Sequence, residues 1–368
     1  MRVAIVVPGG VDRSGEYRVI PALIALIRRL ALHEEIHVFA LRQEDGAAEW
    51  ELAGARIHNV GARHTRLRAV RSIRALHRSA PFAIVHAIWS GPCGQVAVAA
   101  AAPLGIPRLI HVAGGELVAL PEIGYGGQLR WRGRVSERLV LRAATAITAA
   151  SAPVIETIAR LGLTAERVSL GVDLDTWPAR APTRRAVGGP ARLVHVASLN
   201  RVKDQATLLR ALAVLTRQGA SFEMDIVGED TLHGEIHRLA AQLALLPRVR
   251  FHGFLTRRQL RPIVEAAHLM VVSSRHETGP VAVLEAAVAG VPTIGTCVGH
   301  IAEWAPEAAL SVPVGDWAAL AAAIGQVLGD EELRLGIARE AQRRALAEDA
   351  DCTAQRFRAL YARLAARD

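Results

Sequence analysis

The sequence predicts an α/β protein with two doubly wound domains, each a parallel sheet covered by helices on both faces. Short apolar, β-branched runs alternate with helical patterns along most of the chain, which is typical of such sheets. The segment from Pro178 to Pro190 is rich in Pro, Gly and Arg and lacks periodicity, so it predicts a linker. The alternation then starts again, and 368 residues suffice for two domains.

The expected strands are each followed by a helical stretch. In the first half they are Val3–Val7, Ile36–Ala40, Ile84–Ala87, Arg108–Val112 and Ala146–Thr148. In the second half they are Leu193–Ala197, Glu223–Val227, Val249–His252, Leu269–Val272 and Thr293–Gly295, and helical segments follow from Asp316 onward. We expect an N-terminal domain over 1–180, a linker over 181–190, a C-terminal domain over 191–348 and a final helix over 349–368. Ligands of open α/β sheets bind beyond the carboxyl ends of the strands, so the loops there are candidate sites.

The excess positive charge lies in the first half. Residues 1–185 hold 24 basic and 15 acidic residues, whereas residues 186–368 hold 20 of each. Part of the excess follows a helical pattern through Arg66, Arg68, Arg71 and Arg74, and a second cluster runs from Arg130 to Arg142. Such a helix can lie on anionic lipid, grip a phosphate backbone, or pack on the core with a solvated Arg face. Nucleic acid is the weakest of these interpretations, because aromatic residues are only 4% of the chain.

Cysteine usage and the apolar runs favour a cytoplasmic protein. The three cysteines are far apart and unpaired in spacing, which argues against a disulfide framework and a thiolate metal cluster. The N-terminal apolar run Val3–Val7 ends at Pro8 and is unlike a signal peptide. Other apolar stretches are Ala-rich and too short to span a bilayer. We therefore expect a cytoplasmic chain, with peripheral attachment to the inner face of the membrane as an open alternative.

The loop after Leu269–Val272 carries the strongest chemical signal. Gly279 permits an unusual turn, Pro280 suits the first helical position, and the free N–H groups from Val281 onward form an anion site. Glu285 in the following helix can accept two hydrogen bonds from vicinal hydroxyls such as those of a ribose, and Glu277 in the loop can face a reacting sugar. Alternatively, both acids are only helix caps and dipole partners.

This stretch resembles glycosyltransferase family 4, retaining enzymes of the GT-B fold, in which two Rossmann-like domains face each other across a cleft. The matching positions are Ser274, Glu277, Leu284, Glu285, Ala286, Ala289, Gly290 and Pro292, and Thr278 replaces the family's Gly. The resemblance extends to Ile84–Ala87, to Gly171-Val-Asp173 and to the late helix near Asp330. It implies that the last helix packs back on the N-terminal domain.

The family's second phosphate element, Gly-Arg-Leu-x-x-x-Lys, resembles Ala197-Ser198-Leu-Asn-Arg201-Val-Lys203. Lys203 is the only lysine in this chain, which favours a phosphate contact over an ordinary surface residue at a helix N-terminus. Ser198 stands where the family has Arg, and we expect Arg201 to replace it. Two further positions, Gly228 and Leu255, resemble the family's loops at the nucleotide base; the alternative is that they lie in strand-ending turns.

Four N-terminal residues are further site candidates: Gly10 on the donor side, Gly115 and Glu116 on the acceptor side, and His111 as a catalytic residue. Gly10 lies in a loop similar to the family's glycine-rich loop near the diphosphate and acceptor. Gly115 and Glu116 are expected to shape the acceptor pocket. His111 either contacts substrate or is a buried, hydrogen-bonded histidine.

The resemblance implies a retaining glycosyltransferase that moves a sugar from a nucleotide-diphosphate sugar to a hydroxyl of a glycan or lipid-linked acceptor, in glycan, polysaccharide or glycolipid synthesis. Glu277 would position the sugar and Glu285 would hold the ribose. Asp173-Leu-Asp175 spells the Asp-x-Asp of metal-dependent enzymes but matches the family's Gly-Val-Asp segment, so neither metal nor other cofactor is expected. A nucleotide-sugar epimerase or phosphorylase and a non-catalytic nucleotide-sugar-binding homologue remain open. Sugar, base, acceptor and oligomeric state are not specified.

Overall fold

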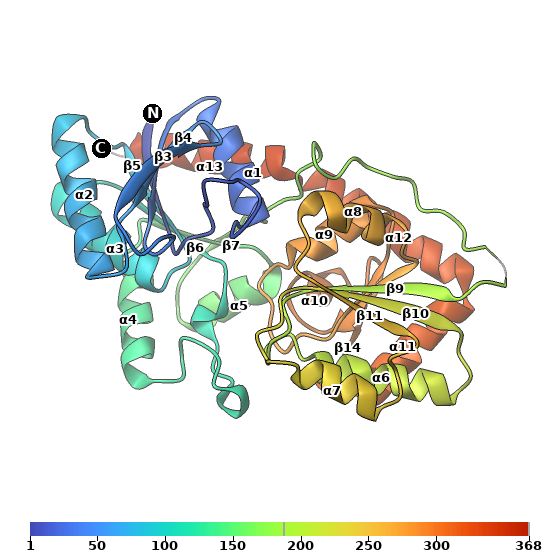
Figure 1. Cartoon of the computed structure of the whole chain (residues 1–368). Coiled ribbons are helices and arrows are strands. Elements are labelled where there is room, and N and C mark those ends of the chain that lie inside the picture. Colours follow the sequence, from blue (N-terminus) through green and yellow to red (C-terminus); the bar gives the residue numbers. More distant parts are fainter. Residues whose placement is uncertain (187, 367–368) are drawn as a thin grey trace. The chain divides into compact units, whose positions relative to one another are not determined.

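The computed structural model describes residues 1–186 and 188–366 and has the expected α/β architecture (Figure 1). Its contacts divide the chain into unit 1, Met1–Asp173 with Glu348–Asp368, and unit 2, Leu174–Ala347. Residues 174–180, expected in the N-terminal domain, make their contacts in unit 2. Residue 187 of the expected linker and residues 367–368 of the expected last helix lie outside the described residues.

Unit 1 is built on one sheet of order β3-β4-β2-β1-β5-β6-β7-β8, in which all pairings are parallel except β3 with β4. The strands are β1 (Arg2–Val7), β2 (Glu35–Ala40), β3 (Ala48–Leu52), β4 (Ala55–Asn59), β5 (Ile84–Ile88), β6 (Arg108–Val112), β7 (Ala146–Ala149) and β8 (Glu166–Arg167). The helices are α1 (Pro21–Ala31), α2 (Thr65–Ser79), α3 (Pro92–Ala101), α4 (Trp131–Arg142), α5 (Ala152–Arg160) and α13 (Ala350–Ala365).

The two faces of this sheet follow from the alternation along β1. Val3, Ile5 and Val7 lie in one buried cluster with residues of α1 and α13, while Ala4 and Val6 lie in another with residues of α2 and α3. Successive strand residues point to opposite faces, so an uninterrupted apolar strand is what a sheet covered on both sides requires.

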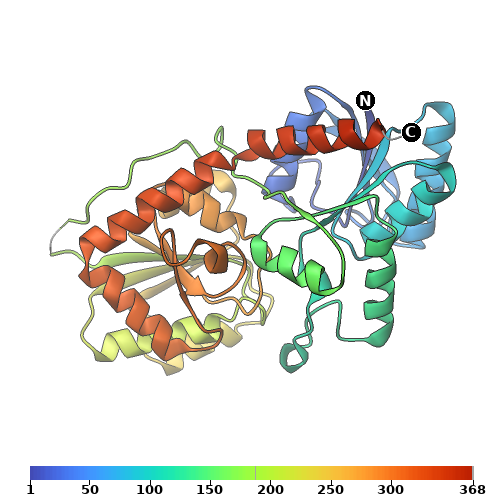
Figure 2. The same cartoon turned by 180° about the vertical axis from the view of Figure 1, so that it is seen from behind.

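The last helix, α13, is part of the unit 1 core (red in Figure 2). Its Phe357, Leu360 and Tyr361 are buried in the α1 cluster. Arg29 of α1, 6% exposed, pairs with Asp351 at 2.8 Å and with Asp173 at 3.0 Å. One buried guanidinium therefore ties α1 to the first turn of α13 and to the point where the chain leaves unit 1.

Unit 2 has a six-stranded, wholly parallel sheet of order β11-β10-β9-β12-β13-β14. Its strands are β9 (Ala191–Val196), β10 (Phe222–Val227), β11 (Val249–Gly253), β12 (Leu269–Val272), β13 (Thr293–Thr296) and β14 (Leu310–Val312). Its helices are α6 (Gln205–Arg217), α7 (Glu235–Gln242), α8 (Arg257–Glu265), α9 (Val281–Val288), α10 (Gly299–Trp304), α11 (Trp317–Gly329) and α12 (Glu331–Ala347).

The segment expected as a linker lies along unit 2. Arg334 of α12, 2% exposed, donates to the backbone carbonyl of Thr183 at 2.6 Å and pairs with Glu331 at 2.6 Å. The hydrogen bonds from Arg334 lower the pKa of Glu331 to about 2. Glu331 in turn accepts from the backbone N–H of Arg185 at 2.8 Å. Two buried or half-buried charges thus hold this Pro-rich stretch against α12.

In each sheet the order in which strands are added reverses next to a central strand, which is β1 in unit 1 and β9 in unit 2. The order runs outward from β1 through β2 on one side and through β5 on the other, and from β9 through β10 and β12 in the same way. At such a switch point the loops at the carboxyl ends of the strands diverge and leave room for a ligand. The fold therefore directs attention to the loops after β1 and β5 and to those after β9 and β12.

Candidate functional site

In unit 2, the loops after β9 and β12 bring together Lys203 and Glu277, the two residues that the sequence selects most sharply. Lys203 Nζ lies 2.5 Å from Glu277 Oε1, and the two side chains are 25% and 11% exposed. The Ser274 hydroxyl also donates to Glu277 Oε1, at 2.6 Å. A half-buried ammonium and carboxylate therefore meet at the switch point of the sheet.

Three further contacts hold these two loops together. Ser273 Oγ donates to the Lys203 carbonyl at 2.9 Å, and the backbone N–H of Arg275 donates to the Val202 carbonyl at 2.7 Å. The Arg275 guanidinium pairs with Asp204 at 3.0 Å, and Asp204 caps the start of α6. Sequence reasoning missed Asp204 and Arg275. The available signal was their position, since both lie in loops that follow neighbouring parallel strands.

The helix after the Glu277 loop begins one residue later than predicted. Pro280 is the N-cap of α9, with extended backbone, and Val281 is the first helical residue. Glu285, predicted for the ribose, lies inside α9 and is 8% exposed. The left-handed backbone near this loop is at Gly299, with φ +50°, rather than at Gly279. A Cβ at position 299 would lie 3.1 Å from the Cβ of Glu277, so this glycine leaves room for the loop.

The remaining predicted donor residues follow β9, β10 and β11 along the same edge of the sheet. The Arg201 side chain is 59% exposed and lies 3.3 Å from Glu235 of α7. Gly228 has φ +153°, and a Cβ there would lie 2.0 Å from the Ala197 carbonyl oxygen. Its N–H donates to the Gly253 carbonyl at 2.8 Å, two residues before the half-buried Leu255. Gly228 is thus required by the close approach of two strand ends, whatever binds beyond it.

In unit 1, the loops after β1, β5 and β6 line an open cavity of about 550 Å³ together with residues of α3 and α4. Gly115 and Glu116, predicted for the acceptor side, line it, together with Trp89, Tyr125 and Glu137. Glycines also line it, and a Cβ at Gly115 would lie 2.5 Å from the Tyr125 hydroxyl oxygen. Gly10 and His111 are not among its lining residues.

One half-buried carboxyl group, Glu116, and one buried carboxyl group, Glu137, line this cavity. Glu116 accepts from the backbone N–H groups of Gly114 at 2.7 Å and Ser90 at 3.1 Å. Burial nevertheless raises the pKa of Glu116, and these hydrogen bonds oppose the rise. Burial also raises the pKa of Glu137 to about 7, with the charge of Glu116 adding to the effect and the Ser90 hydroxyl opposing it. Sequence reasoning missed Glu137, which is one acid among the arginines of α4.

His111 occupies the buried position that the sequence offered as the alternative to a substrate contact. It is fully buried in β6, its Nδ1 lies 2.9 Å from Thr148 Oγ1, and its ring meets the edge of Phe357. Burial lowers the pKa of His111 to about 4. His111 is therefore a neutral core residue at neutral pH.

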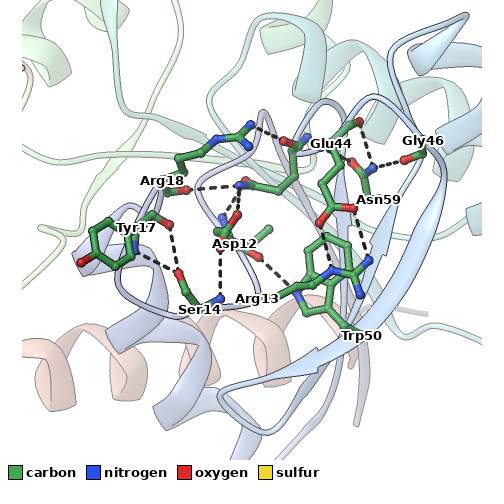
Figure 3. Close-up of polar contacts among 11 residues, drawn as sticks. Asp12, Arg13, Ser14, Tyr17, Arg18, Glu44, Gly46, Trp50 and Asn59 are labelled. Carbon is green, nitrogen blue, oxygen red and sulfur yellow. Dashed lines mark hydrogen bonds and ion pairs between the residues drawn. The ribbon is translucent and has the colours of Figure 1, made fainter.

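The loop after β1, which contains Gly10, is held by polar contacts that include Asp12, Ser14 and Arg18 (Figure 3). Gln43 Oε1 accepts from the backbone N–H of Val11 at 3.0 Å, and Gln43 Nε2 donates to the Arg18 carbonyl at 3.3 Å. Gly10 has φ +78°, and a Cβ there would lie 2.5 Å from the Ile20 side chain. The Ser14 hydroxyl in this loop accepts from the backbone N–H of Tyr17 at 3.0 Å.

The basic surface predicted on α2 is partly tied to the protein. Arg66 donates to Gln95 Oε1 at 2.6 Å, Arg68 to the Val60 carbonyl at 3.2 Å and Arg74 to the Ala99 carbonyl at 2.6 Å, while Arg71 is exposed. These contacts favour the solvated face of a packed helix. None of the helices described is both long and apolar enough to cross a bilayer.

A second exposed surface lies on α4. Trp131, Val135 and Leu139, spaced four residues apart, are 64%, 49% and 62% exposed. The same helix exposes the arginines Arg132, Arg134, Arg138 and Arg142. A helix that only packs on the core does not need an exposed row of apolar side chains between cationic ones.

Asp173, the first acid of the Asp-x-Asp segment, takes part in ion pairs. It accepts from Arg28 at 2.9 Å and from Arg29 at 3.0 Å. Within residues 1–186 and 188–366, no three His, Cys, Asp or Glu side chains are grouped as a metal site would require.

Two family descriptions match successive parts of the chain. "Glycosyl transferase 4-like domain" matches residues 18–171 and "Glycosyl transferases group 1" matches residues 181–344. EpsF of Bacillus subtilis, named as a glycosyltransferase, is 32% identical over 238 residues, or 61% of this chain. A glycogen synthase of Mycobacterium tuberculosis is 32% identical over 176 residues, or 47% of this chain. The matched regions span only 60% and 42% of these two relatives.

Solved structures share the fold over nearly the whole chain. A sucrose-phosphate synthase from Thermosynechococcus elongatus has a TM-score of 0.84 at 20% identity and covers 100% of both chains. The Anabaena protein HepE, in complex with UDP-glucose, has a TM-score of 0.76 at 17% identity and covers 98% of this chain and 99% of its own.

Proposed function

The chain belongs to the family 4 glycosyltransferases, and from this premise we propose that it transfers a sugar, with retention of configuration, from a nucleotide-diphosphate sugar to an acceptor hydroxyl. The observation that carries the proposal is the meeting of Lys203 and Glu277 at the switch point of unit 2, 2.5 Å apart. HepE, which has this fold, was solved with UDP-glucose, which supports a nucleotide-sugar donor. The acceptors are glycans or lipid-linked glycans.

The proposed roles follow from charge and burial. Lys203 binds the donor diphosphate and stabilises the charge that develops on it as the leaving group. Glu277 then hydrogen-bonds the transferred sugar, and Glu285 in α9 holds the ribose. The acceptor oxygen bonds to the anomeric carbon on the face from which the diphosphate departs, and a phosphate oxygen takes the acceptor proton. The side chains thus orient the reactants and stabilise charge.

We propose that the reaction needs no metal, because Lys203, the first N–H groups of α9 and an additional arginine can balance the diphosphate. Both Arg201 and Arg275 lie in the tied loops around Lys203, and each pairs with an acid. Arg275 is the better candidate because its side chain is 29% exposed, against 59% for Arg201, and its backbone N–H donates to Val202 beside Lys203. Transfer that survives a chelator would support this proposal. Transfer that is lost with a chelator and restored by Mg²⁺ or Mn²⁺ would overturn it.

A donor screen tests the central proposal. Thermal unfolding of the parent protein is followed with UDP-, GDP-, ADP- and dTDP-sugars without metal, and the screen is repeated with Glu285→Ala. We expect one nucleotide sugar to raise the midpoint of thermal unfolding by several degrees. A ligand present at about 100 times its Kd raises the free energy of unfolding by roughly 2.7 kcal/mol. The shift should shrink or vanish in Glu285→Ala. Equal shifts in the variant would contradict the role of Glu285, and no shift with any donor would favour a non-catalytic protein.

We also propose that the protein acts at an anionic membrane surface and that α4, rather than α2, is the element that inserts. The α2 arginines are partly engaged in hydrogen bonds within unit 1, whereas α4 exposes Trp131, Val135 and Leu139 among arginines. Apolar residues and cations on one helix favour the interface of an anionic bilayer. Flotation with anionic vesicles measures this binding.

A further inference from the structure

The cavity in unit 1 combines carboxyl groups with aromatic rings. Glu116 and Glu137 line it, as do Trp89 and Tyr125. No Lys, Arg or His side chain in the part of the chain that the structure describes is among its lining residues. Arg66 is not a lining residue, but its guanidinium donates to Gln95, which lines the cavity. A pocket with acids, aromatic faces and no cation among the described residues that line it is suited to a positively charged ligand.

Glu137 is the residue of this cavity whose hydrogen bonding is incomplete. It is 6% exposed, its Oε1 is buried with no donor at full hydrogen-bond distance, and the nearby Ser90 hydroxyl is the side-chain group that lowers its pKa. The Ser90 hydroxyl oxygen is likewise buried with no partner at that distance. Leaving a carboxyl oxygen buried and unpaired is costly, so the folded protein tolerates an unmet need for a donor at this point.

Glu116 adds a second carboxyl group whose oxygens are already bound. They accept from the backbone N–H groups of Gly114 and Ser90, so Glu116 fixes the loop while its charge remains near Glu137. The other titratable residues lining the cavity are Cys93 and Tyr125. Trp89 is held in the left-handed region, with φ +77°, which is uncommon for a bulky residue. The surrounding structure therefore maintains a strained aromatic wall beside the two acids.

We propose that this cavity receives an ammonium group carried by the acceptor, paired with the Glu137 carboxylate and lying against Trp89 and Tyr125. The proposed acceptors are thus glycans or lipid-linked glycans that present a sugar or cyclitol with a free amine. This inference rests on the proposed function only in calling the ligand an acceptor, since binding of the amine needs no donor. A bound ammonium supplies the hydrogen bonds that Glu137 lacks and offsets the repulsion between the two carboxylates.

Calorimetric titration of the donor-free protein with 6-amino-6-deoxy-D-glucose and with D-glucose tests the proposal, because the two sugars differ by one ammonium in place of one hydroxyl. We expect the amine to bind about tenfold more tightly or better at pH 8, as a charge-assisted hydrogen bond predicts. The preference should diminish at pH 6, where Glu137 is largely protonated, and binding at pH 7 should release a proton from Glu137.

Two variants sharpen the result. Glu137→Gln should abolish the preference for the amine, whereas Glu156→Gln, which removes an exposed carboxylate on α5, should keep it. Equal affinity for both sugars, a preference retained in Glu137→Gln, or no binding of the amine at millimolar concentration would each overturn the proposal.

The donor screen separates this failure from that of the proposed function. A donor shift without amine preference overturns only the ammonium site. Amine preference without any donor shift supports the ammonium site and overturns the transferase proposal.

Discussion

The side chain of Glu277 accepts from both Ser274 and Lys203. In the donor-free protein it is therefore paired with the ammonium group that a diphosphate would need. Glu277→Gln keeps a hydrogen-bonding group but removes the competing charge. We expect the affinity for the nucleotide diphosphate to hold or rise, and transfer to fall by about 100-fold or more, because an interaction with the reacting sugar is lost. Titration with the nucleotide that the donor screen selects and steady-state transfer measure the two effects.

Lys203→Met provides the opposite pattern at the same pair. The nucleotide diphosphate should then bind at least about tenfold more weakly, since a charge-assisted contact to phosphate is removed. Arg217→Gln, in the last turn of α6, is the matched control and should leave the affinity unchanged. Equal affinity in Lys203→Met and the parent would place the diphosphate elsewhere.

Glu137 also predicts how stability depends on pH. Its pKa is about 7 in the folded protein against an ordinary value of 4.5, so the folded state binds the extra proton between these values. Stability is therefore lost as pH rises through this window, by up to roughly 3 kcal/mol from this group. Glu137→Gln should match the parent near pH 5 and exceed it near pH 8 in urea denaturation.

The controls for this prediction isolate the sign. Buried His111 acts in the opposite direction, because its lowered pKa costs stability as pH falls below 6.5. That cost is common to parent and variant and cancels in their difference. Glu156→Gln should show no pH-dependent difference. A Glu137→Gln variant less stable than the parent at pH 8 would refute the assignment of a raised pKa.

Single residues were predictable when composition or motif isolated them. Lys203 is distinguished as the only lysine in an arginine-rich chain, and Glu277 by its motif, and the structure places them in contact. Glu137 was not predictable because it is one charge among many in its segment, and Arg275 was not because its ion-pair partner Asp204 lies in another loop. Their significance arises from burial and from partners distant in the sequence, which spacing does not encode.

At the scale of elements, α4 and α2 distinguish an inserting helix from a packed one. Trp131→Ser with Leu139→Ser should reduce flotation with anionic vesicles about tenfold or more, since each buried apolar side chain contributes roughly 1.5–3 kcal/mol. Leu32→Ser, which changes a leucine that is 74% exposed at the end of α1, is the matched control. A variant with four α2 arginines changed to Glu should bind anionic vesicles more weakly through charge alone; the positions are Arg66, Arg68, Arg71 and Arg74. Added salt should therefore weaken vesicle binding by the parent protein as well.

The outcomes of the vesicle experiment assign the surface. Binding that survives the α4 changes but not the α2 changes would return the contact to α2. Absence of binding by the parent would leave both helices as solvated surfaces.

Elements were predictable where their periodicity was long and apolar, and less so at edges. Strands β3 and β4 form an antiparallel hairpin at the edge of the first sheet, with Ala53 and Gly54 at positive φ in the turn. The hairpin was missed because its strands are short and β3 alternates with glutamates, and because Ala53 gives no turn signal. The short strands β8 and β14 were missed because two or three residues carry no recognisable period.

For the whole molecule, the α/β class and the two Rossmann-like sheets were predicted correctly, because both follow from the alternation of strand and helix patterns. The boundary between the two units lies at a different place from the linker that the composition predicts. The Pro-rich stretch near residue 185 is fixed to unit 2 by Arg334 and Glu331, and the chain passes from unit 1 to unit 2 at Asp173. Composition marks irregular backbone, whereas the boundary of a unit depends on which side chains it contacts.

Unit 1 is completed by residues from both ends of the chain, and the two segments that border unit 2 meet there. The Ala350 N–H donates to the Val172 carbonyl at 2.9 Å, and the Gly171 N–H donates to Thr353 Oγ1 at 2.9 Å. Unit 2 is thus an insertion within unit 1. A ribosome makes all of unit 2 before it makes the last helix, so unit 2 can begin to fold first. The N-terminal sheet must wait for Phe357, Leu360 and Tyr361, and one of its apolar faces stays incomplete until these residues have been made.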